Sequence, residues 1–170
     1  MTVLASDALV PKKVFFTSGS GTHTDRLTSF EMALRKASIH CYNLVEVSSI
    51  LPPKCRIVSR QEGLSELMPG SIVFTVISRL SSNEPQARIT SAIGMAIPQD
   101  PDTDWGYFAE YHAYDESKED AGAYAEMIAK DMYAGVSDKV PAKTMNISES
   151  ATVPADGKWT TTVAAAVFII

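Results

Sequence analysis

The sequence NLVEVSSILPP, residues 43–53, is the stretch from which the rest of the chain is best interpreted. Its alternating apolar residues predict a β-strand, which continues into Ser48 and Ser49 and stops at Pro52 and Pro53. The prolines limit how the end of this strand can relax, because each fixes its own φ angle and restricts the residue before it. A Ser-Ser peptide at a constrained strand end can break itself, although adjacent serines are also common in ordinary turns.

Self-cleavage at this point would need no outside reagent. The Ser49 hydroxyl would attack the carbonyl carbon of Ser48 and convert the amide into an ester. β-Elimination would then leave dehydroalanine at position 49, and hydrolysis would release ammonia and leave a pyruvoyl group. The first step requires a polarised carbonyl and a donor for the developing oxyanion. From spacing alone, a serine-rich turn remains the more common explanation.

Length and composition indicate one domain spanning residues 1–170, with 45% apolar and 21% charged residues. The net charge of -5 argues against a surface for nucleic acid. Cys41 and Cys55 are too few for a disulfide framework, and no His/Cys cluster has the spacing of metal ligands. We therefore expect a reducing, cytoplasmic location and no bound metal.

Neither end of the sequence predicts contact with a membrane. Residues 1–10 lack a basic region followed by a long apolar run, so we do not expect a signal peptide there. Residues 160–170 are apolar but about half as long as a membrane-spanning helix, and they are better explained as a buried strand.

The remaining pattern alternates many strands with about two long helices, which predicts a layered α/β or α+β domain with substantial antiparallel pairing. Residues 18–25 are expected to form a polar loop, and Thr28 and Glu31 fit a capping box at the start of the first helix. The periodicity of residues 87–97 does not distinguish strand from helix. Strands are expected at 14–17, 42–47, 56–58, 71–78, 105–114, 144–153 and 159–170, and helices at 27–38 and 117–135.

Residues 43–53 closely resemble the self-cleavage segment of pyruvoyl-dependent arginine decarboxylases. The resemblance continues in order through residues 27–34, 93–98, 110–111 and 164–166, and so covers nearly the whole chain. It implies an α+β fold, a four-layer αββα sandwich with largely antiparallel sheets. It also implies a homo-oligomer of processed αβ units, a trimer or a multiple of trimers, with active sites between subunits.

The resemblance also implies a division of the chain and a reaction. Cleavage would yield a β chain of residues 1–48 and an α chain of residues 49–170, whose N-terminus is a covalent pyruvoyl group derived from Ser49. That group would form a Schiff base with L-arginine and draw electrons from it, so that CO2 leaves and agmatine remains. Two other functions stay open: decarboxylation of another basic amino acid, or an unprocessed, non-catalytic member that acts as a binding or assembly module.

Four other positions match functional residues of the family. Glu110 matches the proton donor, although a glutamate on a strand is otherwise most often part of a salt bridge. Ser48 and Asn43 match positions at the cleavage and substrate site, and an asparagine also commonly begins a strand. Glu31 matches the acid that binds the guanidinium group, where the family usually has aspartate. The longer side chain would change the length of the pocket, so another basic amino acid stays open as the substrate.

Overall fold

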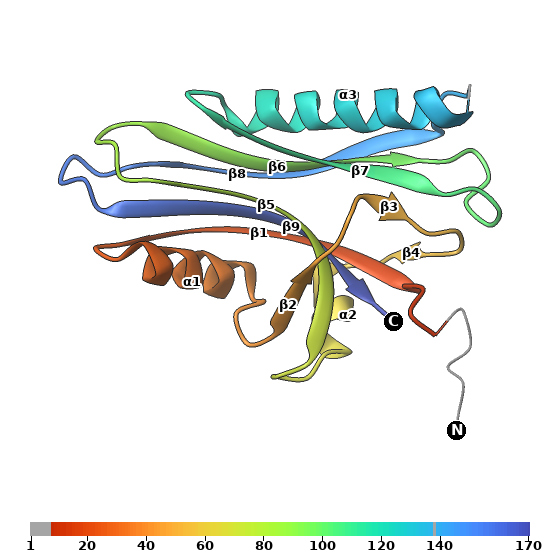
Figure 1. Cartoon of the computed structure of the whole chain (residues 1–170), viewed down its shortest axis with the longest axis horizontal. Helices are drawn as coiled ribbons and strands as arrows, with labels where there is room; N and C mark the ends of the chain where they lie inside the picture. Colours follow the sequence, from red (N-terminus) through yellow and green to blue (C-terminus); the bar gives the residue numbers. More distant parts are fainter. Residues whose placement is uncertain (1–7, 138) are drawn as a thin grey trace.

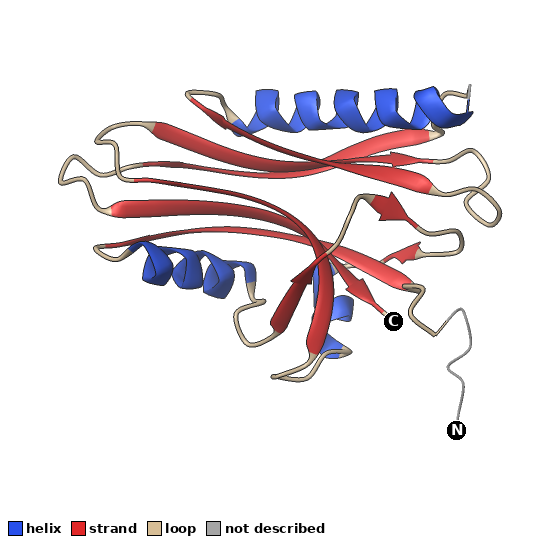
Figure 2. Cartoon of the chain, in the orientation of Figure 1, coloured by secondary structure: helices blue, strands red, loops and turns tan. Residues whose placement is uncertain are grey.

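Two β-sheets lie face to face and carry helices on their outer sides (Figure 1). The computed structural model describes residues 8–137 and 139–170. α3 (Lys118–Ser137) covers one sheet, while α1 (Arg26–Ala37) and α2 (Arg60–Ser65) lie outside the other (Figure 2). The predicted α+β class and the four-layer αββα sandwich are confirmed.

The sheets are mostly antiparallel, as expected; within the described residues, the parallel pairs are β1–β4 and β2–β5. Sheet A contains, in spatial order, β2 (Asn43–Glu46), β5 (Ile72–Ser82), β9 (Trp159–Ile169), β1 (Lys13–His23) and β4 (Arg56–Ile57). Sheet B contains β3 (Ile50–Leu51), β7 (Gly106–Tyr114), β6 (Arg88–Ile97) and β8 (Lys143–Thr152).

The apolar core between the sheets is built from both halves of the sequence. The Phe108 ring of β7 lies edge-on to Phe168 of β9, with ring centroids 5.8 Å apart. Phe16 of β1 contributes a third ring, 6.1 Å from Phe108. Such tilted and edge-on arrangements are the favoured ones for aromatic pairs, so this cluster fixes how the sheets face each other.

The expected loop at residues 18–25 is wrong for its greater part, because β1 continues to His23. Gly19 and Gly21 point toward α1, where an added Cβ would lie 2.5 Å from backbone atoms of Ala33. The helix can therefore pack directly on the strand. On the opposite face, the hydroxyls of Ser18 and Ser20 donate to Glu149 of β8 over 3.3 and 2.8 Å. Glycine and serine alternate here because they lie on opposite faces of a strand, with the glycines against a helix and the serines against the other sheet.

The expected capping box is also wrong. The N-cap of α1 is Asp25, whose carboxylate accepts a hydrogen bond from the Thr28 N–H over 2.8 Å. Glu31 instead accepts from Arg35, one turn further along the helix, over 2.6 Å. The helix thus begins two residues earlier than its predicted cap, since an aspartate side chain satisfies its first N–H groups.

The ambiguous segment 87–97 forms β6, which is central in sheet B and buried on both faces. A strand of this kind has a continuous apolar sequence, so its periodicity is uninformative. Two short elements, β3 and α2, were not predicted; with two and six residues they are too short to show a period. Among the residues that the structure describes, no helix is both long and apolar enough to cross a membrane.

Candidate active site

The Ser48–Ser49 peptide lies where the chain passes from sheet A to sheet B, between β2 and β3 (Figure 1). On one side, the Val47 N–H donates to the Thr75 carbonyl of β5 over 3.0 Å. On the other side, the Ser49 carbonyl accepts from the Phe108 N–H of β7 over 2.9 Å. The two serines therefore cross from one sheet to the other. The residue before them is hydrogen-bonded to sheet A, and Ser49 is hydrogen-bonded to sheet B.

The Ser49 hydroxyl is directed at a carboxylate that is distant in sequence. Its Oγ donates to Glu110 Oε2 over 3.0 Å and to Oε1 over 3.2 Å. Glu110 stands on β7, opposite Ile93 of β6, and is exposed, while Ser49 is half-buried. Two residues that the sequence singled out separately are thus in direct contact.

The carbonyl group of Ser48 also has a donor. The Ile50 N–H donates to the Ser48 carbonyl oxygen over 3.1 Å. A hydrogen bond to this oxygen polarises the carbonyl carbon and stabilises negative charge that develops on the oxygen during attack. This donor is a backbone group, so no side-chain pattern in the sequence could have identified it.

A mostly apolar cavity of about 280 Å³ lies beside the same peptide. Its wall includes Ser48 together with Val47, Ile50, Phe74 and Phe168. The residues here fit a carbonyl cofactor derived from the chain: position 49 carries the hydroxyl it requires, a carboxylate contacts that hydroxyl, and an apolar space lies next to it. Within residues 8–137 and 139–170, no group of three or more His, Cys, Asp or Glu side chains could hold a metal ion.

Asn43 does not share this contact. It begins β2, at the end away from Ser48, and its Nδ2 donates to the Gly70 carbonyl over 2.9 Å. It lines a second cavity of about 350 Å³ together with Glu46 and Arg79, which the sequence did not single out. The Arg79 guanidinium stacks on the ring of Phe30 at 5.1 Å from its centroid. This second cavity is therefore lined by both the Arg79 guanidinium and the Glu46 carboxylate.

Glu31 also lies apart from the two serines in this single chain. It is on α1, which covers the outer face of sheet A, and its carboxylate accepts from Arg35. Across the described part of the chain, no hydrogen bond joins Glu31 to Asn43, Ser49 or Glu110. The structure thus brings together Ser48, Ser49 and Glu110, and leaves Glu31 and Asn43 on another surface.

The structure is that of an α+β sandwich in which a Ser-Ser peptide crosses between the sheets. The hydroxyl of the second serine donates a hydrogen bond to a carboxylate. Comparison with known proteins identifies the family. The family described as pyruvoyl-dependent arginine decarboxylase (PvlArgDC) matches residues 13–170. The chain belongs to this family, whose members are carboxy-lyases and whose name implies a covalently bound pyruvoyl group.

Individual relatives agree with this assignment. The pyruvoyl-dependent arginine decarboxylase of Methanocella arvoryzae is 58% identical over 162 residues, which cover 95% of this chain and 98% of the relative. Pyruvoyl-dependent arginine decarboxylase 1 of Methanosarcina mazei is 56% identical over the same shares of the two chains. The corresponding protein 1 of Archaeoglobus fulgidus is 53% identical, with 95% of this chain and all of the relative covered. The resemblance inferred from residues 43–53 is confirmed.

Proposed function

We propose that this chain is a self-processing decarboxylase that converts L-arginine to agmatine and CO2, with Ser49 as the source of its pyruvoyl group. One observation carries the proposal: the Ser49 hydroxyl contacts both carboxylate oxygens of Glu110 at the peptide that crosses between the sheets. Arginine as substrate is supported by the names of the family and of its relatives.

Maturation uses groups of the chain itself. As Ser49 Oγ attacks the Ser48 carbonyl carbon, Glu110 Oε2 takes the hydroxyl proton and the Ile50 N–H stabilises the oxyanion. The C–N bond between the serines breaks and an ester forms. β-Elimination frees the Ser48 carboxylate and leaves dehydroalanine at 49, and hydrolysis with loss of ammonia completes the carbonyl. The products are chains 1–48 and 49–170.

Turnover then relies on the same carboxyl group. When formed, the pyruvoyl group supplies the electron-withdrawing carbonyl that allows CO2 to leave. Glu110, which matches the proton donor of the family, delivers a proton to Cα of the decarboxylated substrate. Ser48 borders the mostly apolar cavity of about 280 Å³, in which we place the carboxylate of the substrate.

Glu31 and Asn43 serve the substrate from a neighbouring copy of the chain in this proposal. Both lie away from Ser49 in one chain, so a complete site requires a second subunit, as in a trimer or a multiple of trimers. Large apolar side chains are exposed close to Asn43: Met68 is 74% and Ile72 is 70% exposed. Subunit contact would cover them. We place the enzyme in the cytoplasm, because Cys41 and Cys55 are both free thiols.

Intact mass under denaturing conditions tests the processing. We expect two chains of 48 and 122 residues, the longer with an N-terminal ketone, and a single uncleaved chain for Ser49→Ala. Release of CO2 is then compared for arginine, lysine and ornithine. A single chain in the wild-type protein, or equal turnover of all three substrates, would contradict the corresponding part of the proposal.

The assembly has its own test. Native mass spectrometry should show a mass that is a multiple of three processed units. A monomer that decarboxylates arginine at full rate would exclude a site shared between subunits.

A further inference from the structure

Cleavage between Ser48 and Ser49 creates a free end that must stay close to Glu110, and this inference rests on that proposed cleavage. Before cleavage, residues 49–58 are attached at both ends. Afterwards the strand pairing that holds the segment is short, since two residue pairs join β3 to β7 and two join β4 to β1. The buried Leu51 side chain and a hydrogen bond from the Lys54 N–H to the Pro101 carbonyl add to it. Such short pairings are marginal by themselves, so the next element along the chain, α2, should contribute to holding the segment.

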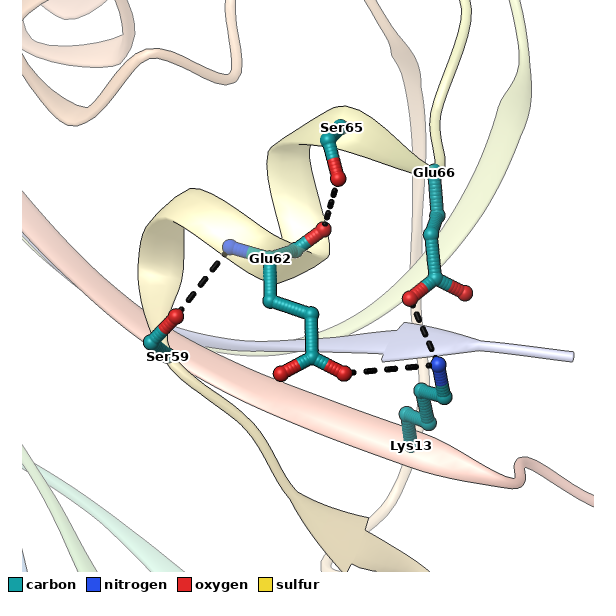
Figure 3. A network of polar contacts seen from close by, with 5 residues as sticks. All are labelled: Lys13, Ser59, Glu62, Ser65 and Glu66. Carbon is teal, nitrogen blue, oxygen red and sulfur yellow. Dashed lines mark hydrogen bonds and ion pairs between the residues drawn. The ribbon is translucent and has the colours of Figure 1, made fainter.

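α2 is attached to the other half of the chain by an ion-pair network (Figure 3). Lys13 Nζ of β1 lies 2.6 Å from Glu66 Oε1 and 3.5 Å from Glu62 Oε1. The hydrogen bond with Glu66 raises the pKa of Lys13 above 10.5, so its ammonium group stays charged in ordinary buffers. Lys13 belongs to residues 1–48, whereas both glutamates belong to residues 49–170. The network would therefore join the two products of cleavage.

Two further contacts fix α2 against the shorter product. Gly63 lies on the ring of Phe15, where an added Cβ would be 2.1 Å from Cδ1. Arg60 Nη2 donates to Ser38 Oγ over 2.6 Å and to the Lys36 carbonyl over 3.1 Å. The Ser59 hydroxyl accepts from the Glu62 N–H over 3.1 Å and so caps the helix at the end nearer the free segment (Figure 3).

We propose that Lys13, through Glu62 and Glu66 of α2, is a positioning residue that holds residues 49–58 in place once the chain has been cut. It touches neither the substrate nor the reacting atoms. Its contribution should be larger in the cleaved protein than in the intact one, because the peptide bond to Ser48 no longer restrains the segment. This difference separates positioning of the new end from a general role in stability.

Cys55 provides a direct readout, because its thiol is partly buried in the core between the sheets and lies within the freed segment. In a Cys41→Ser background it is the single thiol, since the sequence has two cysteines. We would measure its rate of labelling by iodoacetamide in the cleaved protein with Lys13→Met. Lys12→Met removes the same charge from the exposed neighbouring residue and serves as the matched control.

We expect Lys13→Met to raise the labelling rate of the cleaved protein about two- to fivefold, the range for an exposed ion-pair network. Lys12→Met should leave the rate unchanged, and Lys13→Arg should preserve most of the protection. In uncleavable Ser49→Ala protein, Lys13→Met should have a clearly smaller effect. Equal effects with and without cleavage, or no effect at all, would overturn the proposal. A wild-type chain that stays uncleaved on a denaturing gel would overturn the proposed function. The gel therefore separates failure of the proposed self-cleavage from failure of the role of Lys13.

Discussion

Glu110→Gln is the change that most directly tests the chemistry at the crossing peptide. The substitution nearly preserves shape but removes the carboxylate that accepts the Ser49 hydroxyl proton over 3.0 and 3.2 Å. The amide oxygen of glutamine can still accept a hydrogen bond from the Ser49 hydroxyl, but it cannot take the proton as the hydroxyl attacks. Loss of a general base slows a reaction by about 10²- to 10⁴-fold, and we take the lower part of this range because Glu110 is exposed and water can take the proton in its place.

We therefore expect self-cleavage of Glu110→Gln to be about 10² to 10³ times slower than that of the wild-type chain. The assay follows freshly purified uncleaved protein by intact mass and reports the fraction of 122-residue chain with time. Glu119→Gln, which removes a charge from the exposed first turn of α3, controls for net charge. Cleavage of Glu110→Gln at the wild-type rate would refute the role of Glu110 as the proton acceptor in maturation.

Three further predictions follow from packing, charge and burial. Gly94→Ala should lower the free energy of unfolding by about 2 kcal/mol, because the new Cβ would lie 2.1 Å from the Ala125 backbone; Gly135→Ala, with nothing within 4 Å, should be neutral or stabilising in the same denaturant titration. Burial raises the pKa of the Cys55 thiol from 9.0 to about 12. Above pH 9 the unfolded chain loses this proton while the folded chain keeps it, so the free energy of unfolding should fall as the pH rises from 9 toward 12. Urea titrations should show this fall in the free energy of unfolding for the wild-type protein and not for Cys55→Ala. Glu31→Ala should raise the KM for arginine at least tenfold and leave self-cleavage unchanged, as steady-state kinetics and a denaturing gel would report.

The local sequence is enough to single out the Ser48–Ser49 peptide, because its signal is local. Two serines followed by two prolines lie within residues 48–53, and the strands and long helices around them have clear periods. The contact between Ser49 and Glu110, in contrast, cannot be predicted from local sequence. Glu110 reaches it because β3 pairs with β7 at the edge of sheet B, and strand order cannot be read from either segment alone. Only resemblance to a family connected these two positions before the structure did.

The failures have a common physical origin. β1 was shortened because glycine and serine usually mark loops, yet Gly19 and Gly21 are required where α1 packs directly on the strand. α2 is not predictable because six residues show no period, and its glutamates pair with Lys13, some fifty residues earlier in the chain. In each case a contact across the fold outweighs local propensity, and a single sequence does not reveal such a contact.

The place of the Ser48–Ser49 peptide explains how the proposed cleavage there would leave the fold intact. Most of the energy that holds the two products together lies elsewhere. β1 of the shorter product pairs with β9 of the longer one over eleven registered residues, from Lys13 to His23, in the middle of sheet A. Phe16 of the shorter product also packs against Phe108 in the core between the sheets. A peptide that crosses between sheets belongs to neither ladder, so breaking it removes no strand pairing. The proposed cleavage at this peptide should therefore cost little stability.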